Sequence, residues 1–259
     1  MKKHRWFAAL AVMVMALAVA GCSDGSSGNE FATGSSGESG NSSGAGNSGV
    51  DYSKCVVGDF VLKDGTILSK DETPESGTVA AVIVRAAADG KPALGVGIVH
   101  NQSGLAWCTE SAEGISTDIT SLHFDYEDGR DGWEKLKEAC SDAESNPENY
   151  PAWNYSLTYA KTNGLTGDLA TGWYFPTLAE LETICKNKTA IDESLSKAGG
   201  STFGTSSYWS CIQIPWEKQK HYAYSFTFNK HPWYGTEGYP SENPKRANHV
   251  SVCSVRAFN

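Results

Sequence analysis

The chain has 259 residues, of which 40% are hydrophobic and 20% are charged, and its formal net charge is −9. These proportions are typical of a globular protein with enough apolar residues to build a hydrophobic core. Proteins that bind nucleic acids need a basic surface to contact phosphates, so the acidic balance argues against a nucleic acid as the partner.

The first residues have the features of an export signal. Basic residues precede an apolar run over residues 6–20, which is too short for an ordinary membrane span. The run ends in VAGC, which resembles a bacterial lipobox and implies that residues 1–21 are a signal peptide, cleaved before Cys22. The same resemblance implies lipidation of the Cys22 thiol. The alternative is a plain secretory signal, with Cys22 close to the cleavage site by chance.

Residues 22–50 combine the lipidated cysteine with a segment rich in serine and glycine. Such a segment cannot bury enough apolar surface to fold, so we expect a flexible tether, with ends separated by roughly 30 Å. Without the signal peptide, 18 basic residues remain against 30 acidic ones, a net charge of −12. We expect a lipid anchor in a bacterial membrane, by analogy the outer membrane, with residues 51–259 displayed at the surface.

The displayed part begins with patterns that are typical of a β-sheet. Short apolar runs surround the turn signals Asp64-Gly65 and Asp89-Gly90, which predicts antiparallel strands joined by hairpins. The predicted strands cover residues 57–69, 78–86, 93–100 and 104–108.

The middle of the chain has helical patterns. Asp131 and Glu134 have the spacing of a capping box, which predicts a helix start. Residues 150–164 predict a second helix. In GWYFPTLAEL, Thr177 and Glu180 have the same spacing, and the apolar residues that follow recur at helical intervals. We therefore expect an extended segment that turns into a short helix at this junction.

The C-terminal part combines strand-like runs with long loops. The runs cover residues 206–214, 222–228 and 250–258, and the loops cover residues 215–222 and 229–249. The second loop is too long for an ordinary hairpin connection, and loops of that length are usually functional or disordered. Disordered segments are poor in aromatic residues, whereas these loops are rich in them. We expect ordered loops whose aromatics contact a ligand. The alternative is a local cluster that only stabilises the loop.

The order of these segments resembles a known family. VGDFVLKDGT, YPAW, GWYFPTLAEL, YWS and a terminal VRAF together resemble the C-type-lectin-like fold of the formylglycine-generating-enzyme type, over residues 55–258. Within it, the chain resembles the variable proteins of diversity-generating retroelements, and the lipobox and tether are similar to those of the treponeme variable lipoproteins. The resemblance implies an α+β fold with antiparallel sheets and a few helices. It also implies a monomeric receptor for a protein or glycan on another cell, diversified by adenine-directed mutagenesis over about residues 206–258.

Strand periodicity helps to divide the variable region. Tyr224, Phe226 and Phe228 share a face that we predict to be core, so Ser225 and Thr227 point toward the ligand side. The predicted ligand face consists of Trp216, His221, Tyr222, Ser225, Thr227, His231, Trp233, Tyr234, Tyr239 and His249. Codons of the AAY kind reach Tyr, Ser, Asn, His or Asp but not Trp. The two tryptophans are therefore expected to be fixed or to be reached from another codon, and the other positions are candidates for variation.

The namesake of the fold oxidises cysteine with a close pair of cysteines, so a cysteine oxidase is a less favoured alternative. Cys211 and Cys253 are the candidate pair, and we expect them on adjacent strands as candidate disulfide partners. No hydrolase or phosphate-binding motif is present, and no spacing of the C-terminal histidines suggests a metal site. We therefore expect no enzyme activity, no metal and no cofactor. A further alternative is a non-diversified adhesin or a structural surface lipoprotein.

Overall fold

The computed structural model describes residues 50–124, 126–216 and 219–259, which belong to one compact unit. The predicted signal peptide, Cys22 and all of the tether except Val50 lie outside the described residues. Within the described ranges, no helix is long and apolar enough to cross a membrane.

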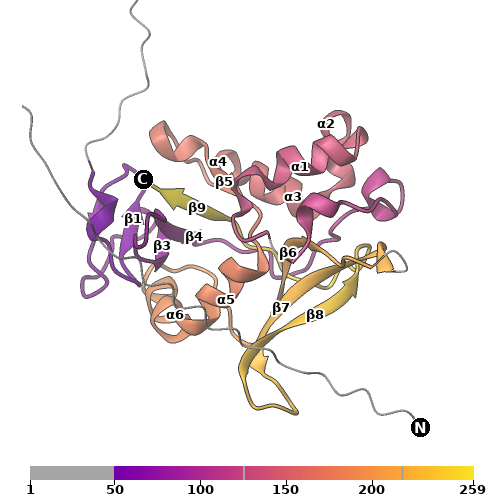
Figure 1. Ribbon diagram of the computed structural model, residues 1–259. Coiled ribbons are helices and arrows are strands. Elements are labelled where there is room, and N and C mark those ends of the chain that lie inside the picture. Colours follow the sequence, from indigo (N-terminus) through magenta and orange to yellow (C-terminus); the bar gives the residue numbers. More distant parts are fainter. Residues whose placement is uncertain (1–49, 125, 217–218) are drawn as a thin grey trace, which may run out of the picture. The chain divides into compact units, whose positions relative to one another are not determined.

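The larger sheet has six strands in the order β2-β1-β3-β4-β9-β5, and every neighbouring pair is antiparallel (Figure 1). The predicted turns at Asp64-Gly65 and Asp89-Gly90 join β1 to β2 and β3 to β4. The strands are β1 (Phe60–Leu62), β2 (Ile67–Leu68), β3 (Val79–Arg85), β4 (Ala93–Gly97), β5 (Trp173–Tyr174) and β9 (Val255–Phe258).

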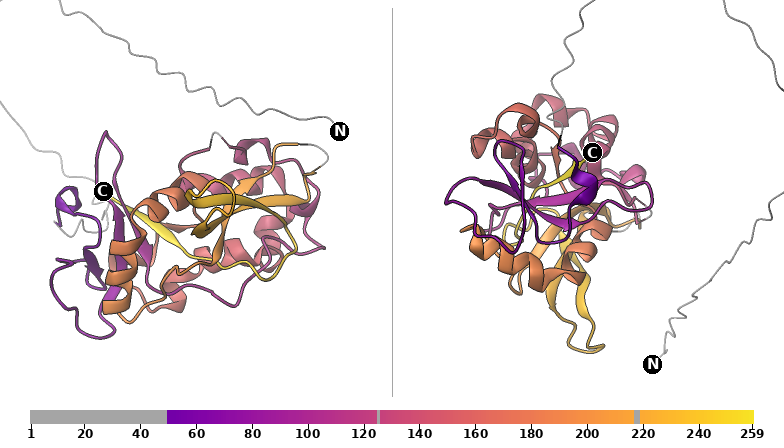
Figure 2. Two further views of the ribbon diagram at one scale, coloured as in Figure 1. Left: turned by 90° about the horizontal axis from the view of Figure 1, so that it is seen from below. Right: turned by 90° about the vertical axis from the view of Figure 1, so that its left-hand side faces the viewer.

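The smaller sheet has three antiparallel strands in the order β6-β7-β8. They are β6 (Ser207–Gln213), β7 (Tyr222–Lys230) and β8 (Glu237–Pro244). A single parallel bridge between Tyr208 and Ser251 links β6 to the segment that leads into β9. The long β7–β8 hairpin projects beyond α5, and two views at right angles agree on this (Figures 1 and 2).

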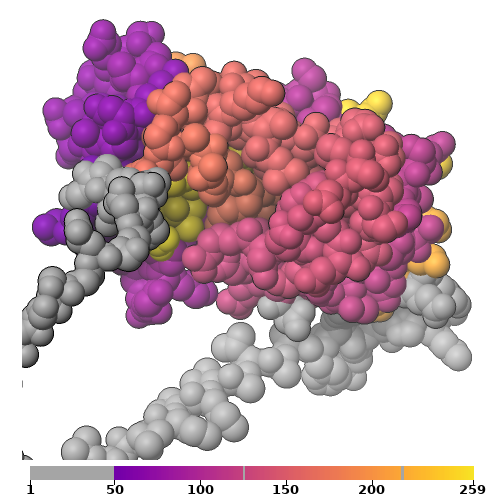
Figure 3. All heavy atoms as spheres, turned by 90° about the horizontal axis from the view of Figure 1, so that it is seen from above, coloured from indigo at the N-terminus to yellow at the C-terminus, as the bar shows by residue number. Residues whose placement is uncertain are grey.

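The described residues contain six α-helices and several short 3-10 turns. The helices are α1 (Gly132–Ala139), α2 (Asp142–Ser145), α3 (Pro151–Leu157), α4 (Tyr159–Thr162), α5 (Leu178–Lys186) and α6 (Lys188–Lys197). The region of α1 to α4 covers most of the face seen in Figure 3. Helix α5 contacts β3 of the larger sheet and all three strands of the smaller one, so it connects the two sheets.

The start of α5 confirms the capping box predicted in GWYFPTLAEL. The Thr177 hydroxyl accepts a hydrogen bond from the Glu180 backbone N–H at 3.2 Å, and the Glu180 carboxyl accepts one from the Thr177 N–H at 2.8 Å. The capping box predicted at Asp131 is wrong, because the Asp131 side chain makes no cap hydrogen bond. It contacts Tyr126 and Lys135 instead.

The C-terminal loops are where the structure departs most from the sequence prediction. Residues 229–249 contain β8 and are therefore the second half of a hairpin and not a long loop. Residues 104–108 form no strand, and only the last four residues of the predicted strand 250–258 belong to β9. Strand β8 was missed because its sequence, EGYPSENP, has a glycine and two prolines, which are rare in central strands.

Strand β8 tolerates these prolines because it is an edge strand. Lys245 N–H, one residue past β8, donates to the His221 carbonyl at 2.8 Å, so odd-numbered residues direct their backbone groups toward β7. The backbone groups of Pro240 and Pro244 consequently face outward, where a missing N–H breaks no ladder bond. The outer edge of β8 is therefore poor in hydrogen-bond donors.

The described residues form a mixed α+β domain with antiparallel sheets and a few helices, which confirms the predicted fold class at this level. Aromatic and aliphatic side chains from both sheets and from α1 to α6 form its buried clusters. Tyr224, Phe226 and Phe228 are each 4% exposed, as expected for the core face of β7.

Candidate ligand-binding site at the C-terminal hairpin

The tip of the β7–β8 hairpin is a compact turn that His231 organises. The His231 backbone N–H donates to the Thr236 carbonyl at 2.8 Å, and Gly235 N–H donates to the His231 carbonyl at 3.0 Å. The His231 ring nitrogen Nδ1 accepts hydrogen bonds from the backbone N–H groups of Trp233 and Tyr234, both at 3.2 Å. The His231 side chain therefore fixes the backbone that carries both aromatics.

The aromatic side chains of the tip differ in exposure. Trp233 is 86% exposed and Tyr234 is 81% exposed, so neither belongs to a buried cluster. Tyr239 is half-buried, with its ring centre 4.6 Å from that of His231, and the ring centre of Tyr234 lies 4.7 Å from that of His231. The alternative of a local aromatic cluster therefore applies to His231 and Tyr239 but does not account for Trp233.

An open groove of about 680 Å³ lies beside the tip. Its walls come from the hairpin, from the first turns of α5 and from the segment that precedes α1. The apolar side chains that line it are Phe124, Leu178, Ala179, Phe226, Tyr234 and Pro240. Phe124 is 53% exposed and packs against Tyr224 with ring centres 4.6 Å apart.

A second depression lies at the other end of the hairpin. It has a volume of about 580 Å³, and His221 and Tyr222 line it together with Ile115 and Arg246. Trp216, 50% exposed, lies in the connection between β6 and β7 at this same end. Because His221 and His231 flank the nine residues of β7, they are separated by roughly 30 Å.

The residues predicted for one ligand face therefore form two separate groups. His231, Trp233, Tyr234 and Tyr239 gather at the tip, and Trp216, His221 and Tyr222 gather at the base. His249 is exposed beside the backbone of Gly104 and lines neither depression. The hairpin brings the first group next to a groove that strand periodicity alone could not show.

Two residues predicted to point toward a ligand are buried instead. Ser225 is fully buried, and its hydroxyl accepts a hydrogen bond from the Asn243 amide at 2.8 Å. Thr227 is 9% exposed and hydrogen-bonds Ser207 at 2.7 Å and Ser241 at 3.1 Å. The prediction for Ser225 and Thr227 is wrong because β6 and β8 lie on both sides of β7 and enclose these small polar side chains.

The candidate disulfide is absent, since Cys211 and Cys253 are both free thiols. Their segments are neighbours, but the bridge between Tyr208 and Ser251 places Cys253 on the same side as Tyr208. Cys211 is three residues past Tyr208 and faces the opposite side, where it belongs to a different buried cluster. Burial raises the pKa of both thiols, which disfavours the reactive thiolate.

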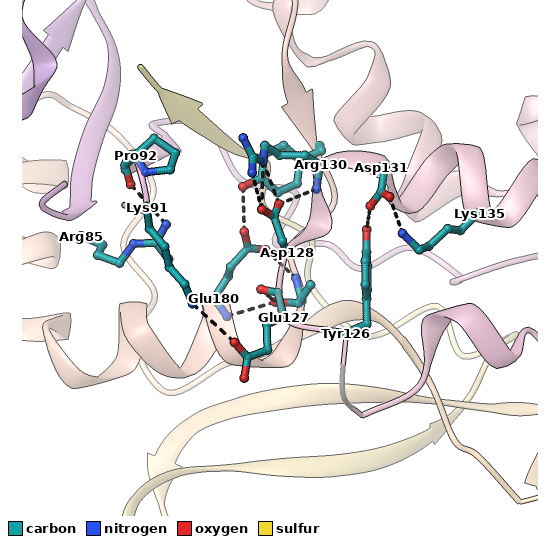
Figure 4. Close-up of polar contacts among 12 residues, drawn as sticks. Arg85, Lys91, Pro92, Tyr126, Glu127, Asp128, Arg130, Asp131, Lys135 and Glu180 are labelled. Carbon is teal, nitrogen blue, oxygen red and sulfur yellow. Dashed lines mark hydrogen bonds and ion pairs between the residues drawn. The ribbon is translucent and has the colours of Figure 1, made fainter. Parts of the chain in front are cut away.

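A polar network lies around Glu180 and Asp128, beside the start of α5 (Figure 4). The buried Glu180 carboxyl accepts hydrogen bonds from the Tyr174 hydroxyl at 2.7 Å and from Thr177, and burial raises its pKa. Asp128 and Arg130 form a bidentate ion pair in the segment that leads into α1. The Thr177 hydroxyl donates to the Glu127 carbonyl at 3.2 Å and so joins the start of α5 to that segment, and both elements contribute to the groove wall.

Sequence reasoning missed Phe124 and Lys245. Phe124 follows no helical or strand pattern, so nothing in the sequence marks it as part of a groove. Lys245 is fully buried, donates from Nζ to the Gly114 carbonyl at 2.5 Å and lies 4.8 Å from the centre of the Trp107 ring. Burial lowers its pKa to about 8. Lys245 thus fastens the end of β8 to the rest of the domain.

Comparisons with known proteins identify a related fold. No protein-family model and no curated protein matches the chain. The chain is similar in structure to a fimbrial protein from Bacteroides ovatus ATCC 8483, with a TM-score of 0.59 and 14% sequence identity. The match covers 79% of this chain and 49% of the other, so this chain spans about half the length of that protein. At this level of identity, the likeness concerns the fold alone.

Proposed function

We propose that this protein is a surface-displayed lipoprotein that binds a protein or glycan ligand at the tip of its C-terminal hairpin. The observation that carries the proposal is the exposure of Trp233 and Tyr234 beside the apolar groove. Exposed apolar patches commonly mark interaction sites. Tyrosine and tryptophan also provide large contact areas at a low cost in conformational entropy.

The cellular location is part of the same proposal. A lipobox at Cys22 and a flexible tether support attachment to a membrane with the domain held away from it. The structural likeness to a protein described as fimbrial supports a position at the cell surface. Binding without catalysis agrees with the two buried thiols, whose raised pKa values disfavour the chemistry of a cysteine oxidase.

The proposal extends to the family. We assign the domain to the C-type-lectin-like fold of the formylglycine-generating-enzyme type, with a C-terminal region that varies as in diversity-generating retroelement proteins. His231, Tyr234 and Tyr239 are the positions at the tip whose residue types fit that variation. Backbone pairing along β7 and β8 supports such a role, because main-chain hydrogen bonds persist when side chains change. Variation at His231 would remove the two hydrogen bonds that its ring accepts from the turn.

The double variant Tyr234→Ser, Tyr239→Ser tests the proposed site. The full chain is screened against a displayed library of random peptides and against an array of glycans. Ligands recovered with the native protein should lose at least about tenfold in affinity for the double variant, equivalent to about 1.4 kcal/mol. The free energy of unfolding should fall by no more than about 2 kcal/mol, because Tyr234 is largely exposed and Tyr239 is only half-buried.

Tyr222→Ser is the matched control, since it removes a tyrosine at the opposite end of the same hairpin. It should leave binding at the tip unchanged. If the recovered ligands bind the double variant as tightly as the native protein, the proposal is contradicted. A loss of several kcal/mol in unfolding free energy would also contradict it, because that result would place the tyrosines in a structural cluster.

A further inference from the structure

We infer that the groove at the hairpin tip binds a protein segment in which an apolar side chain is flanked by lysine or arginine. This inference rests on the proposed function and narrows the ligand to one chemical class. It follows from the walls of the groove, from its charged groups and from the backbone edge beside it.

The walls favour a protein segment over a sugar. Phe124, Leu178 and Phe226 supply apolar surface from three different parts of the fold. A volume of about 680 Å³ lies within the usual range of ligand pockets. Each sugar hydroxyl that loses water against such a wall without gaining a partner costs about 1–3 kcal/mol. An apolar side chain carries no such cost and gains from burial.

The charged side chains that line the groove are all acidic among the described residues, namely Glu182 and Glu237. Glu237 forms no ion pair within the described part of the chain. Glu182 pairs with Lys186 at 3.0 Å, but both side chains are more than half exposed, so the pair is weak. Lys230 lies opposite Glu237 in the pairing of β7 with β8. Its side chain lines, with Lys186 and Lys188, a separate depression that shares only Glu237 with the groove.

The backbone beside the groove adds hydrogen-bond acceptors. Pro240 turns its carbonyl outward from β8 and has no N–H to offer. A partner that brings donors is therefore matched to this edge, and lysine and arginine side chains are donors only. The negative charge of the whole chain would also attract a basic partner over longer distances.

Peptides selected on the full chain from a random twelve-residue library test the inference. The relevant peptides are those that lose binding to Tyr234→Ser, Tyr239→Ser, because they depend on the tip. We expect them to be enriched in lysine and arginine next to a leucine, phenylalanine or other large apolar residue. Replacing their basic residues by glutamate should weaken binding at least tenfold, and raising NaCl from 50 to 500 mM should weaken it as well.

The charge-reversal variant Glu182→Lys, Glu237→Lys should invert this preference, so that the glutamate versions of the peptides bind better. Glu148→Lys, Glu193→Lys makes the same change in net charge at exposed positions outside the groove and should leave the preference as it is. The inference would be overturned if the peptides that depend on the tip are not enriched in lysine and arginine. An unchanged preference in the groove variant, or tip-dependent binding of glycans alone, would also overturn it. If no ligand of either kind depends on the tip, the proposed function itself fails.

Discussion

Lys245 is a buried cation at the end of β8 and carries an electrostatic cost. It is fully buried, and burial lowers its pKa from 10.5 to about 8. A difference of this size corresponds to about 3 kcal/mol between the charged and neutral forms. The hydrogen bond to Gly114 and the contact with Trp107 offset part of this cost. The side chain therefore links β8 to the domain at the expense of stability near neutral pH.

The variant Lys245→Met makes this cost measurable. Between pH 8 and 10.5 the unfolded chain holds a proton on Lys245 that the folded chain has released, so this residue makes native stability rise with pH. Methionine lacks that contribution. Relative to the variant, the native protein should therefore gain up to about 3 kcal/mol as the pH rises from 7 to 10.5. Chemical denaturation at several pH values measures the difference, with the exposed Lys161→Met as control. If the difference in unfolding free energy between the native protein and Lys245→Met does not change with pH, that result contradicts the argument.

The hairpin as an element depends on a glycine close to its tip. Gly238 has a φ of +70°, and a Cβ atom there would lie 2.5 Å from the Phe226 ring and 2.6 Å from the Cys185 sulfur. Gly235 has a similar φ of +69°, but its nearest neighbour would be the end of Lys230 at 3.8 Å. Both glycines therefore adopt a left-handed backbone that would strain any other residue. The two positions differ in the space available for a side chain.

Alanine at these two positions separates strain from packing. Gly235→Ala should cost about 1 kcal/mol, because only the left-handed backbone is penalised. Gly238→Ala should cost about 2–4 kcal/mol, because a clash within the groove wall is added to that strain. Denaturant unfolding of both variants measures the free energies. Equal losses would show that the hairpin can shift away from α5 without cost.

The same hairpin shows how far the sequence determines the site. Local sequence signals were sufficient to predict the helix start in GWYFPTLAEL. There the proline and the Thr177–Glu180 pair specify the start of α5 without help from distant segments. Local signals failed for β8, because a proline-containing edge strand has the composition of a loop. They also failed for Ser225, whose burial depends on strands on both sides of β7. Contacts between distant segments, such as Phe124 with the hairpin, leave no periodic pattern at all.

At the scale of the whole molecule, the proposed diversification makes a prediction about DNA. The gene should lie near a reverse transcriptase gene and a near-copy of the last ~150 nucleotides of its own coding sequence, differing at adenines. The substituted codons should include those of His231, Tyr234 and Tyr239 at the tip. They should spare Gly238, where the close packing leaves no room for a side chain. Sequencing the neighbourhood in several isolates decides this, and a uniform C-terminal region without a template would leave a receptor of fixed specificity.

The outward-facing prolines of β8 have a consequence for the proposed attachment to a membrane. Copies held by the proposed lipid anchor would be confined to a plane, where their local concentration is high and collisions between exposed sheet edges are frequent. A strand edge with a full set of donors would let neighbouring copies join into continuous sheets. With Pro240 and Pro244 on that edge, two of the donors such a joint would need are missing. Crowded copies can then remain separate while their aromatic tips stay free for a ligand.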